Sequence, residues 1–517
     1  MTQTAVPALI EQMMQSEFYP HPVKEPIRMM QTHVSYVFLT GDYAYKVKKP
    51  VNFGFLDFST LEARQHFCLE EMRMNRPLAP EIYLEVLPVT QSSDRVSEPR
   101  FELNKAGQPV EYVLKMREFP QDDLFICMFE QGRLTETHME ELGQIVAQFH
   151  AQAETNDYIR SFGEVSQVRQ AIDENYQQTE KYIGGPQTIE QFEETRQFTD
   201  AFFASQQELF NSRIQNNWIR ECHGDLHLRN ICCWQDKIQL FDRIEFNEPF
   251  RFVDVMYDIA FAVMDLEARG RKELGNAFLN TYIEHTGDWE GLKILPLYLS
   301  RQAYVRAKVN SFLLDDPAVP PDLKQEAEAT AAQYYKLAWE YTRQRKGQLF
   351  LMSGLSGSGK TTVARHLARR LGAIHIRSDA VRKHLAGIPL EQQGGADLYT
   401  SAMSQKTYDR LLELGIKLAS LGFPVILDAK YDRQALRQEA IAQAKSYQLP
   451  VQIIHCTAPE DVLRDRLSSR TGDISDATPD LLQNQQAAAE PFTDEEQSLV
   501  TTLDTTQDWT SQILISD

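Results

Sequence analysis

This sequence is short of three things: cysteines at metal-binding spacing, long apolar runs and positive charge. Its six cysteines are scattered among 517 residues, which is typical of reduced, mostly buried thiols rather than of a metal centre or a disulfide framework. No stretch approaches the roughly 20 apolar residues that span a bilayer, and the N-terminus lacks the basic and apolar regions of a signal peptide. We therefore expect a cytoplasmic protein with no membrane partner.

Positive charge is in deficit because 53 Lys and Arg face 73 Asp and Glu, which gives a formal net charge of −20. Such a surface repels phosphate backbones over most of its area, so nucleic acid is not an expected partner. The balance still permits a local basic pocket. Nothing in the sequence sets the oligomeric state.

Length and patterning predict two domains, because one hydrophobic core rarely serves a chain this long. Residues 1–345 show strand patterns followed by long helical patterns, which is typical of an α+β domain. Residues 346–517 alternate short apolar strands with helices, which predicts a parallel sheet with helices on both faces, a three-layer α/β domain. The predicted strands lie at 34–59 (including VNFGFLDFS), 82–89, 110–117 and 230–242, then at 348–353, 373–376, 424–429, 451–456 and 498–504.

A glycine-rich loop, GLSGSGKT, follows the strand pattern QLFLMS and precedes a helix pattern. It fits G-x-x-x-x-G-K-[ST], in which backbone N–H groups and the helix N-terminus face phosphate oxygens. We expect Lys360 to reach the β- and γ-phosphates of ATP and Thr361 to bind Mg²⁺. The residues assigned to nucleotide binding here are Gly354, Leu355, Ser356, Gly357, Ser358, Gly359, Lys360, Thr361 and Thr362.

Five further positions in this half suggest catalytic chemistry. Asp379 follows the strand AIHI, where it could accept a proton from a substrate hydroxyl, and Arg382 lies one helical turn beyond it. Asp428 ends the strand PVILD, where it could hold Mg²⁺ or orient the substrate. Arg466 and Arg470 share a helix face and could close on the transferring phosphate as a lid, although such pairs are often only a solvated face. Together these features resemble the P-loop predicted-kinase group, related to gluconate, shikimate and zeta-toxin-type kinases.

A second motif, HGDLHLRN at 223–230, matches the H-x-D-x-x-x-x-N catalytic loop of kinase-like enzymes. Asp225 would act as the base beside the acceptor hydroxyl, and Asn230 and Asp242 would bind metal. His223 is expected to brace the loop rather than to act as a base. Asp258 is expected to tie the loop to the following helix.

The segment AYKVKK resembles the strand that carries the ATP-binding lysine, and its alignment favours Lys46 over Lys48. Glu70 or Glu71 would pair with this lysine, with a slight preference for Glu70. EYVLKMREF at 111–119 resembles the hinge strand that contacts adenine. Together with HGDLHLRN, these residues resemble the aminoglycoside phosphotransferase family over about 30–340, in a branch commonly fused to a P-loop kinase.

The sequence departs from that family at two places. Leu228 and Arg229 replace the usual small or turn residues, and TGDYAYK has one glycine where three are usual. The acceptor is also open, because acidic helices at 160–215 would suit a cationic substrate, whereas Arg301, Arg306 and Lys308 would suit an anionic one.

These observations predict a bifunctional ATP- and Mg²⁺-dependent kinase in which each domain phosphorylates a hydroxyl of a small-molecule acceptor, such as a sugar or a sugar-like alcohol. One alternative is an ATP-binding regulator in which one domain is catalytically silent. Another is a P-loop domain that phosphorylates RNA ends or nucleotide-sugars.

Overall fold

The computed structural model describes residues 5–92, 100–469, 472–476 and 478–512. Contacts divide the chain into two compact units. The first unit consists of residues 1–135, 152–168 and 210–262, and the second consists of residues 136–151, 169–209 and 263–517. These units cut across residue 345, so the limits 1–345 and 346–517 stay a prediction.

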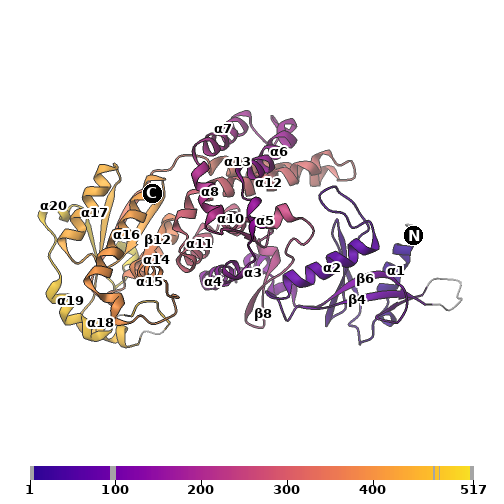
Figure 1. Ribbon diagram of the computed structural model, residues 1–517, viewed down its shortest axis with the longest axis horizontal. Helices are drawn as coiled ribbons and strands as arrows, with labels where there is room; N and C mark the ends of the chain where they lie inside the picture. Colours follow the sequence, from indigo (N-terminus) through magenta and orange to yellow (C-terminus); the bar gives the residue numbers. More distant parts are fainter. Residues whose placement is uncertain (1–4, 93–99, 470–471, 477, 513–517) are drawn as a thin grey trace. The chain divides into compact units, whose positions relative to one another are not determined.

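The first unit is built on a six-stranded antiparallel sheet with the order β1-β2-β3-β6-β4-β5 (Figure 1). Helix α2 lies between β3 and β4 in the chain and packs against β4 and β6. The elements are α1 (Ala5–Met13), β1 (Arg28–Gln31), β2 (Ser35–Leu39), β3 (Tyr43–Lys48), α2 (Leu61–Asn75), β4 (Tyr83–Gln91), β5 (Phe101–Leu103) and β6 (Pro109–Arg117).

The expected strand VNFGFLDFS at 51–59 is absent, and this segment holds only an isolated bridge between Asn52 and Asp57. The side chain of Asn52 accepts a hydrogen bond from the Gly54 N–H (2.8 Å), and Gly54 has a φ of +83°. This local turn competes with an extended ladder. It leaves Phe53 and Phe55 exposed on the same side of the segment, where their rings stack at 6.2 Å.

Two small antiparallel sheets frame the HGDLHLRN motif in the first unit. Strand β7 (Ile219–Glu221) pairs with β10 (Phe252–Asp254), and β8 (Ile231–Trp234) pairs with β9 (Lys237–Leu240). The motif lies between β7 and β8, and Asp242 follows β9. Short helices complete this region: α3 (Phe125–Glu130), α5 (Asp157–Ser161) and α9 (Glu248–Arg251).

Long helices form the remainder of the region before residue 345. The contact between α12 and α13 is the most extensive among these helices, and α7 packs against α13. The helices are α4 (Glu136–Gln152), α6 (Val165–Thr179), α7 (Ile189–Ser205), α8 (Gln207–Gln215), α10 (Val255–Ala268), α11 (Lys272–Thr286), α12 (Leu295–Asp315) and α13 (Pro321–Glu340).

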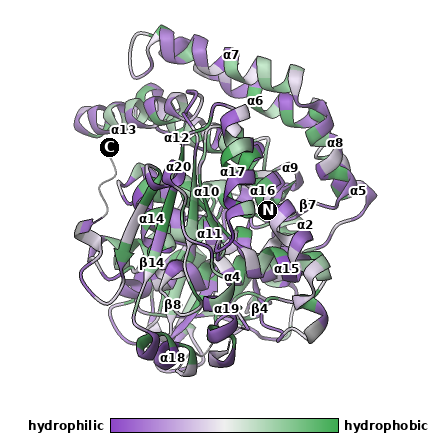
Figure 2. Ribbon diagram, turned by 90° about the vertical axis from the view of Figure 1, so that its left-hand side faces the viewer, coloured by the Kyte–Doolittle hydropathy of each residue, from purple (hydrophilic) through white to green (hydrophobic). Residues whose placement is uncertain are grey.

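The C-terminal part of the second unit is a P-loop domain with a five-stranded parallel sheet in the order β12-β13-β11-β14-β15. The strands and main helices are β11 (Gln348–Ser353), α14 (Lys360–Leu371), β12 (Ile374–Arg377), α15 (Ser378–Ala386), α16 (Ser401–Ser420), β13 (Pro424–Asp428), α17 (Gln434–Ser446), β14 (Val451–Thr457), α18 (Glu460–Ser468), α19 (Leu482–Ala488), α20 (Asp494–Gln497) and β15 (Val500–Asp504). Figure 2 shows the sheet strands coloured mostly as hydrophobic, which fits strands covered on both faces.

The junction into β11 runs tightly along the end of α16. A Cβ atom added to Gly347 would lie 1.8 Å from the carbonyl oxygen of Ala419, and one added to Gly422 would lie 2.6 Å from the carbonyl oxygen of Arg345. Real Cβ atoms essentially never approach this closely. The two glycines therefore allow the connecting chain to pack directly against the turn after α16.

None of the six cysteines, which all lie in the described residues, forms a disulfide bond. None of the helices in the described residues combines the length and apolarity that a membrane span requires.

Candidate active sites

Strand β3 brings two lysines to one face of the antiparallel sheet, because side chains two apart on a strand point the same way. Lys46 Nζ donates hydrogen bonds to Glu71 Oε1 (2.8 Å) and Asp242 Oδ1 (2.7 Å). Lys48 Nζ donates to Glu71 Oε2 (2.7 Å) and also pairs with Glu245. Each oxygen of the buried Glu71 carboxylate therefore accepts from a different lysine.

The partner of Lys46 is Glu71, so the preference for Glu70 was wrong. Glu70 instead pairs with Arg73 on its own helix, with 2.6 Å between Oε1 and Nη2. Consecutive helical residues point about 100° apart, so only one of the two carboxylates can face the sheet. Glu71 lies on the buried stripe with Cys68 and Asn75.

Electrostatics keeps this cluster charged in spite of its burial. Burial lowers the pKa of Lys46, but Asp242 and Glu71 outweigh it and hold that pKa well above its usual value. Burial raises the pKa of Glu71, yet Lys46 and Lys48 bring it below the ordinary range. Glu245 differs, because burial raises its pKa more than Lys48 lowers it.

Asp258 anchors the catalytic loop. Its carboxylate accepts hydrogen bonds from the backbone N–H groups of His223 (3.1 Å) and Gly224 (2.7 Å). Gly224 has a φ of +84°, and a Cβ there would lie 2.7 Å from the carbonyl oxygen of Phe250. Burial lowers the pKa of His223 to about 4, so its ring is neutral at neutral pH. His223 Nε2 donates to the carbonyl oxygen of Phe241 (3.0 Å), which places it as a brace between the loop and the end of β9.

Asp225 and Asn230 lie together at the mouth of this loop. Asn230 Nδ2 donates to the carboxylate Oδ2 and the carbonyl oxygen of Asp225, both at 3.0 Å. The amide nitrogen of Asn230 is thereby engaged, and its amide oxygen is the atom left to face a metal ion. Asp242 has a φ of +60°, and its N–H donates to the hydroxyl of Tyr83 (3.1 Å). Asn230 and Asp242 thus offer hard oxygen donors of the kind that Mg²⁺ prefers.

In the P-loop domain the glycine-rich loop connects β11 to α14. Gly354 has a φ of +134°, and a Cβ there would lie 2.4 Å from the carbonyl oxygen of Cys456, so no larger residue fits. Lys360 Nζ donates to the carbonyl oxygens of Gly354 (3.0 Å) and Leu355 (2.8 Å). The lysine is therefore folded over the loop that the phosphates would occupy.

Asp428, at the end of β13, forms a buried pair with His375. Its Oδ2 lies 3.0 Å from His375 Nε2 on the neighbouring strand β12. Burial opposes ionisation, but the hydrogen bond and charge of His375, with Arg377 and Lys360, lower the pKa of Asp428 to about 2. An ionised carboxylate that lines the same cavity as the Thr361 hydroxyl fits Mg²⁺ coordination.

A cavity of about 1800 Å³ opens over the P-loop. It brings together the expected residues Lys360, Thr361, Asp379, Asp428 and Arg466. Burial raises the pKa of Asp379, against the opposing effect of Arg377 and Arg382. Arg382 is itself buried, and its Nε has no hydrogen-bond partner.

Of the two arginines expected to act as a lid, only Arg466 lies in the described residues. Arg466 donates to the carbonyl oxygen of Gly357 (3.3 Å) and to Thr505 Oγ1 (2.9 Å), so it already touches the phosphate-binding loop. Arg470 lies outside the described residues.

The cationic residues of α12 do not form one exposed patch. Lys308 Nζ donates to the side chains of Asn175 (2.6 Å) and Gln178 (3.0 Å) on α6. Arg306 stacks on the ring of Tyr334, and Arg301 borders a void of only about 10 Å³. These contacts stabilise the helices, so they carry no argument for an anionic acceptor.

Sequence reasoning missed several residues of both sites. Lys48 was considered only as a rival to Lys46, and Glu245 and His375 were not considered at all. Their roles arise from pairing between distant strands and loops, and no local motif marks them. The period-two spacing of Lys46 and Lys48 was the one signal that could have predicted a shared carboxylate.

The chain is similar to one family model and to other proteins. A family model described as an AAA domain (AAA_33) matches residues 349–492. The uncharacterized protein Rv2004c of Mycobacterium tuberculosis is 31% identical over 467 residues, which is 89% of this chain and 90% of that protein.

Two solved structures are also similar to the chain. A choline/ethanolamine kinase family protein from Mesorhizobium loti aligns with 65% of this chain and 99% of its own, at 10% identity and a TM-score of 0.39. A gluconokinase from Sinorhizobium meliloti aligns with 33% of this chain and 88% of its own, at 23% identity and a TM-score of 0.24. The expected fold class is confirmed by the structure: an α+β region with a six-stranded antiparallel sheet precedes an α/β region with a P-loop and a five-stranded parallel sheet.

Proposed function

The chain belongs to the same family as Rv2004c of Mycobacterium tuberculosis, and we propose that it is a bifunctional ATP-dependent kinase with two separate active sites. The observation that carries the proposal is that each half places a carboxylate suited to act as a base near the lysine proposed to bind phosphate. Asp225 lies close enough to Asp242, which accepts a hydrogen bond from Lys46, to influence its pKa. Asp379 and Lys360 line the same cavity. ATP binding alone does not require such a base.

In the kinase-like half, Lys46 would hold the phosphates of ATP while Glu71 fixes the lysine. Because Lys48 donates to the second oxygen of Glu71, that carboxylate keeps a partner when Lys46 turns to the nucleotide. Asp225 accepts the proton of the acceptor hydroxyl. The acceptor oxygen then bonds to the γ-phosphorus, the bond from that phosphorus to the bridging oxygen breaks, and ADP leaves.

In the P-loop half, backbone N–H groups of the loop and the start of α14 bind the phosphates. Lys360 would leave the carbonyl groups that it now contacts and reach the transferring phosphate. Asp379 would take the acceptor proton, which its raised pKa favours. The buried guanidinium of Arg382 would pair with an anionic group of the acceptor, so we infer a hydroxylated acid for this site.

Magnesium fits both sites, held by Asn230 and Asp242 in one and by Thr361 and Asp428 in the other. Bound with ATP, it would supply positive charge between the phosphates during transfer. The limits of the two domains, placed at residue 345, and the sugar-like nature of the first acceptor are part of the same proposal.

The test compares Asp225→Asn and Asp379→Asn in the full chain. Phosphorylated products formed from ATP and a mixture of polyols and sugar acids are measured by mass spectrometry, together with ADP. Each substitution should lower one product by about 10²–10⁴-fold and leave the other unchanged. Exposed carboxylates on the same halves, changed as Asp236→Asn and Asp409→Asn, serve as matched controls.

Loss of both products in either single variant would instead indicate one site that gates the other. If wild-type protein binds ATP but yields only one product, the other half is a regulator. If no product forms at all, the proposed function is wrong.

A further inference from the structure

Helix α11 lies along β12, the edge strand of the P-loop sheet, although it precedes residue 345 in the chain. The side-chain amides of Asn276 and Asn280 both donate to the carbonyl oxygen of Ala373, each at 3.0 Å. Asn280 Oδ1 also accepts from the N–H of His375 (2.8 Å). Backbone groups of an edge strand need partners, and α11 provides them here.

The C-terminal turn of α11 reaches the acceptor side of the P-loop site. Glu284 Oε1 lies 3.4 Å from Nη1 of Arg377, the last residue of β12, and Arg377 also pairs with Asp473. The carbonyl oxygen of Glu284 accepts from His384 Nε2 (2.8 Å) on α15. Helix α15 begins with Ser378 and Asp379, so the helix that carries the proposed base is joined to α11 at both ends.

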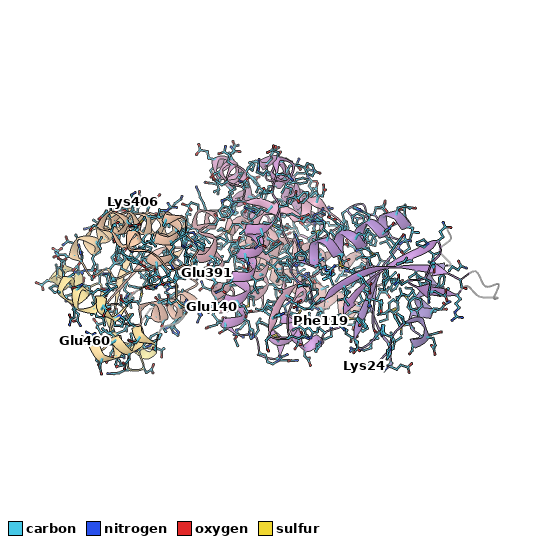
Figure 3. All side chains as sticks on the ribbon, turned by 60° about the horizontal axis from the view of Figure 1, so that its bottom comes forward. Lys24, Phe119, Glu140, Glu391, Lys406 and Glu460 are labelled. Atoms are coloured by element: carbon cyan, nitrogen blue, oxygen red, sulfur yellow. The ribbon has the colours of Figure 1, made fainter. Side chains whose placement is uncertain are left out.

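Residues from before residue 345 also line the 1800 Å³ cavity itself. Helix α11 contributes Thr281, Glu284 and His285, and α4 contributes Glu140 and Gln144. His285 Nε2 lies 3.6 Å from Glu391 Oε1, on the segment after α15 that covers another side of the cavity. Glu140 and Glu391 are labelled in Figure 3.

Charged residues of α4 and α11 complement those of the P-loop domain. Arg377 is 5% exposed and needs carboxylate partners, which Glu284 and Asp473 provide. On α14, Arg369 pairs with Glu136 and Glu140 of α4. A P-loop domain without α4 and α11 would therefore leave a buried guanidinium without one of its anions and the acceptor cavity open on one side.

We propose that α11 forms the acceptor wall of the P-loop active site, with Thr281 and His285 in contact with the acceptor and Glu284 as a positioning residue that fixes Arg377 beside Asp379. This inference rests on the proposed kinase function of the P-loop half. Part of the acceptor specificity of the P-loop half would then come from residues that lie before residue 345 in the sequence.

The test uses the full chain with Thr281→Val, His285→Ala, Glu284→Ala and Glu284→Gln. Steady-state transfer from ATP to the sugar acids and polyols of the same mixture gives KM and kcat, and AMP-PNP binding is measured by calorimetry. Thr281→Val and His285→Ala should raise the acceptor KM about tenfold with kcat and the Kd of AMP-PNP unchanged. Glu284→Ala should also lower kcat about tenfold, because Arg377 is released, and Glu284→Gln should recover most of that loss.

Lys272→Ala, on the exposed first turn of α11, is the matched control and should behave as wild type. Hydrogen exchange over residues 374–386 should rise in Glu284→Ala and not in the control. The inference is overturned if wild-type protein phosphorylates an acceptor and the three wall positions alter neither KM nor kcat by more than twofold. Absence of any phosphorylated product with wild-type protein overturns the kinase proposal itself.

Discussion

The buried charge cluster at β3 makes the stability of the kinase-like domain depend on Lys48. Lys48 is 2% exposed, and its ammonium group contacts two buried carboxylates, Glu71 and Glu245. In Lys48→Met, Glu71 keeps Lys46, but Glu245 loses the cation that it contacts. Removing one partner of a buried ion pair typically costs about 3–5 kcal/mol, so we expect a loss of that size.

The assay is urea unfolding followed by pulsed hydrogen exchange of peptides that cover β3 and α2, which reports this domain separately from the rest of the chain. With an m-value of about 3 kcal/mol/M, the midpoint should fall by about 1 M or more. Lys49→Met is the matched control, because Lys49 is half-buried just after the same strand and its ammonium contacts the carbonyl oxygen of Thr32 and the ring of Tyr36 rather than a carboxylate.

A second variant separates lost packing from unpaired charge. Adding Glu245→Gln to Lys48→Met removes the carboxylate that lost its cation, and should restore about 1–3 kcal/mol of the free energy of unfolding. The single variant should also be more stable at pH 5 than at pH 8. A carboxyl whose folded pKa is raised binds its proton more tightly in the folded state, so its stability contribution is lost as pH rises. A midpoint within 0.2 M (about one part in five of the expected change) of wild type, or no recovery in the double variant, would refute this reasoning.

Two further predictions concern the P-loop domain. Gly354→Ala should remove AMP-PNP binding at the P-loop site, because its Cβ would lie 2.4 Å from the carbonyl oxygen of Cys456, so calorimetry should detect only the site of the kinase-like half. Binding at both sites in this variant would contradict the loop geometry. Gly395→Ala is the control, because Gly395 has a φ of −77° and no atom lies within 4 Å of an added Cβ. Acid should destabilise this domain through Asp428. The pKa of its carboxyl is about 2 in the folded state and near 4 in the unfolded state, so its ionised form adds about 2–3 kcal/mol to the free energy of unfolding. This contribution is complete above pH 4 and is lost as pH falls towards 2. In thermal unfolding between pH 2 and pH 6, His375→Phe should lose most of that acid sensitivity, and an unchanged pH profile would contradict the assigned pairing.

Motifs predicted the parts of both sites that are local in sequence. GLSGSGKT defines a loop whose glycines, lysine and helix start are consecutive, and HGDLHLRN does the same for Asp225 and Asn230. In both cases the chemistry requires residues within one turn or loop, so spacing carries the information. The alternation of strands and helices after residue 348 likewise predicted the parallel sheet.

Choices that depend on contacts between distant segments could not be predicted in this way. Glu70 and Glu71 are adjacent and chemically identical, and only the face that α2 presents to the sheet separates them. VNFGFLDFS has the composition of a strand, but the turn at Asn52 and Gly54 prevents a ladder. Glu284 belongs to an ordinary amphipathic helix, and its relation to Arg377 arises from packing across 93 positions of sequence.

The glycine junction before β11 bears on how this chain can be engineered. Gly347 and Gly422 let two backbone segments pass within a distance that excludes any side chain. The segment that joins the P-loop domain to the rest of the chain is therefore not a flexible linker that another sequence could replace. A chimera that grafts another P-loop domain after residue 346 would need glycine at both points and a matching turn after α16. Without them, steric clashes at the junction would push the sheet of the new domain away from α11. Exchange of P-loop domains at this junction should therefore succeed only between close relatives.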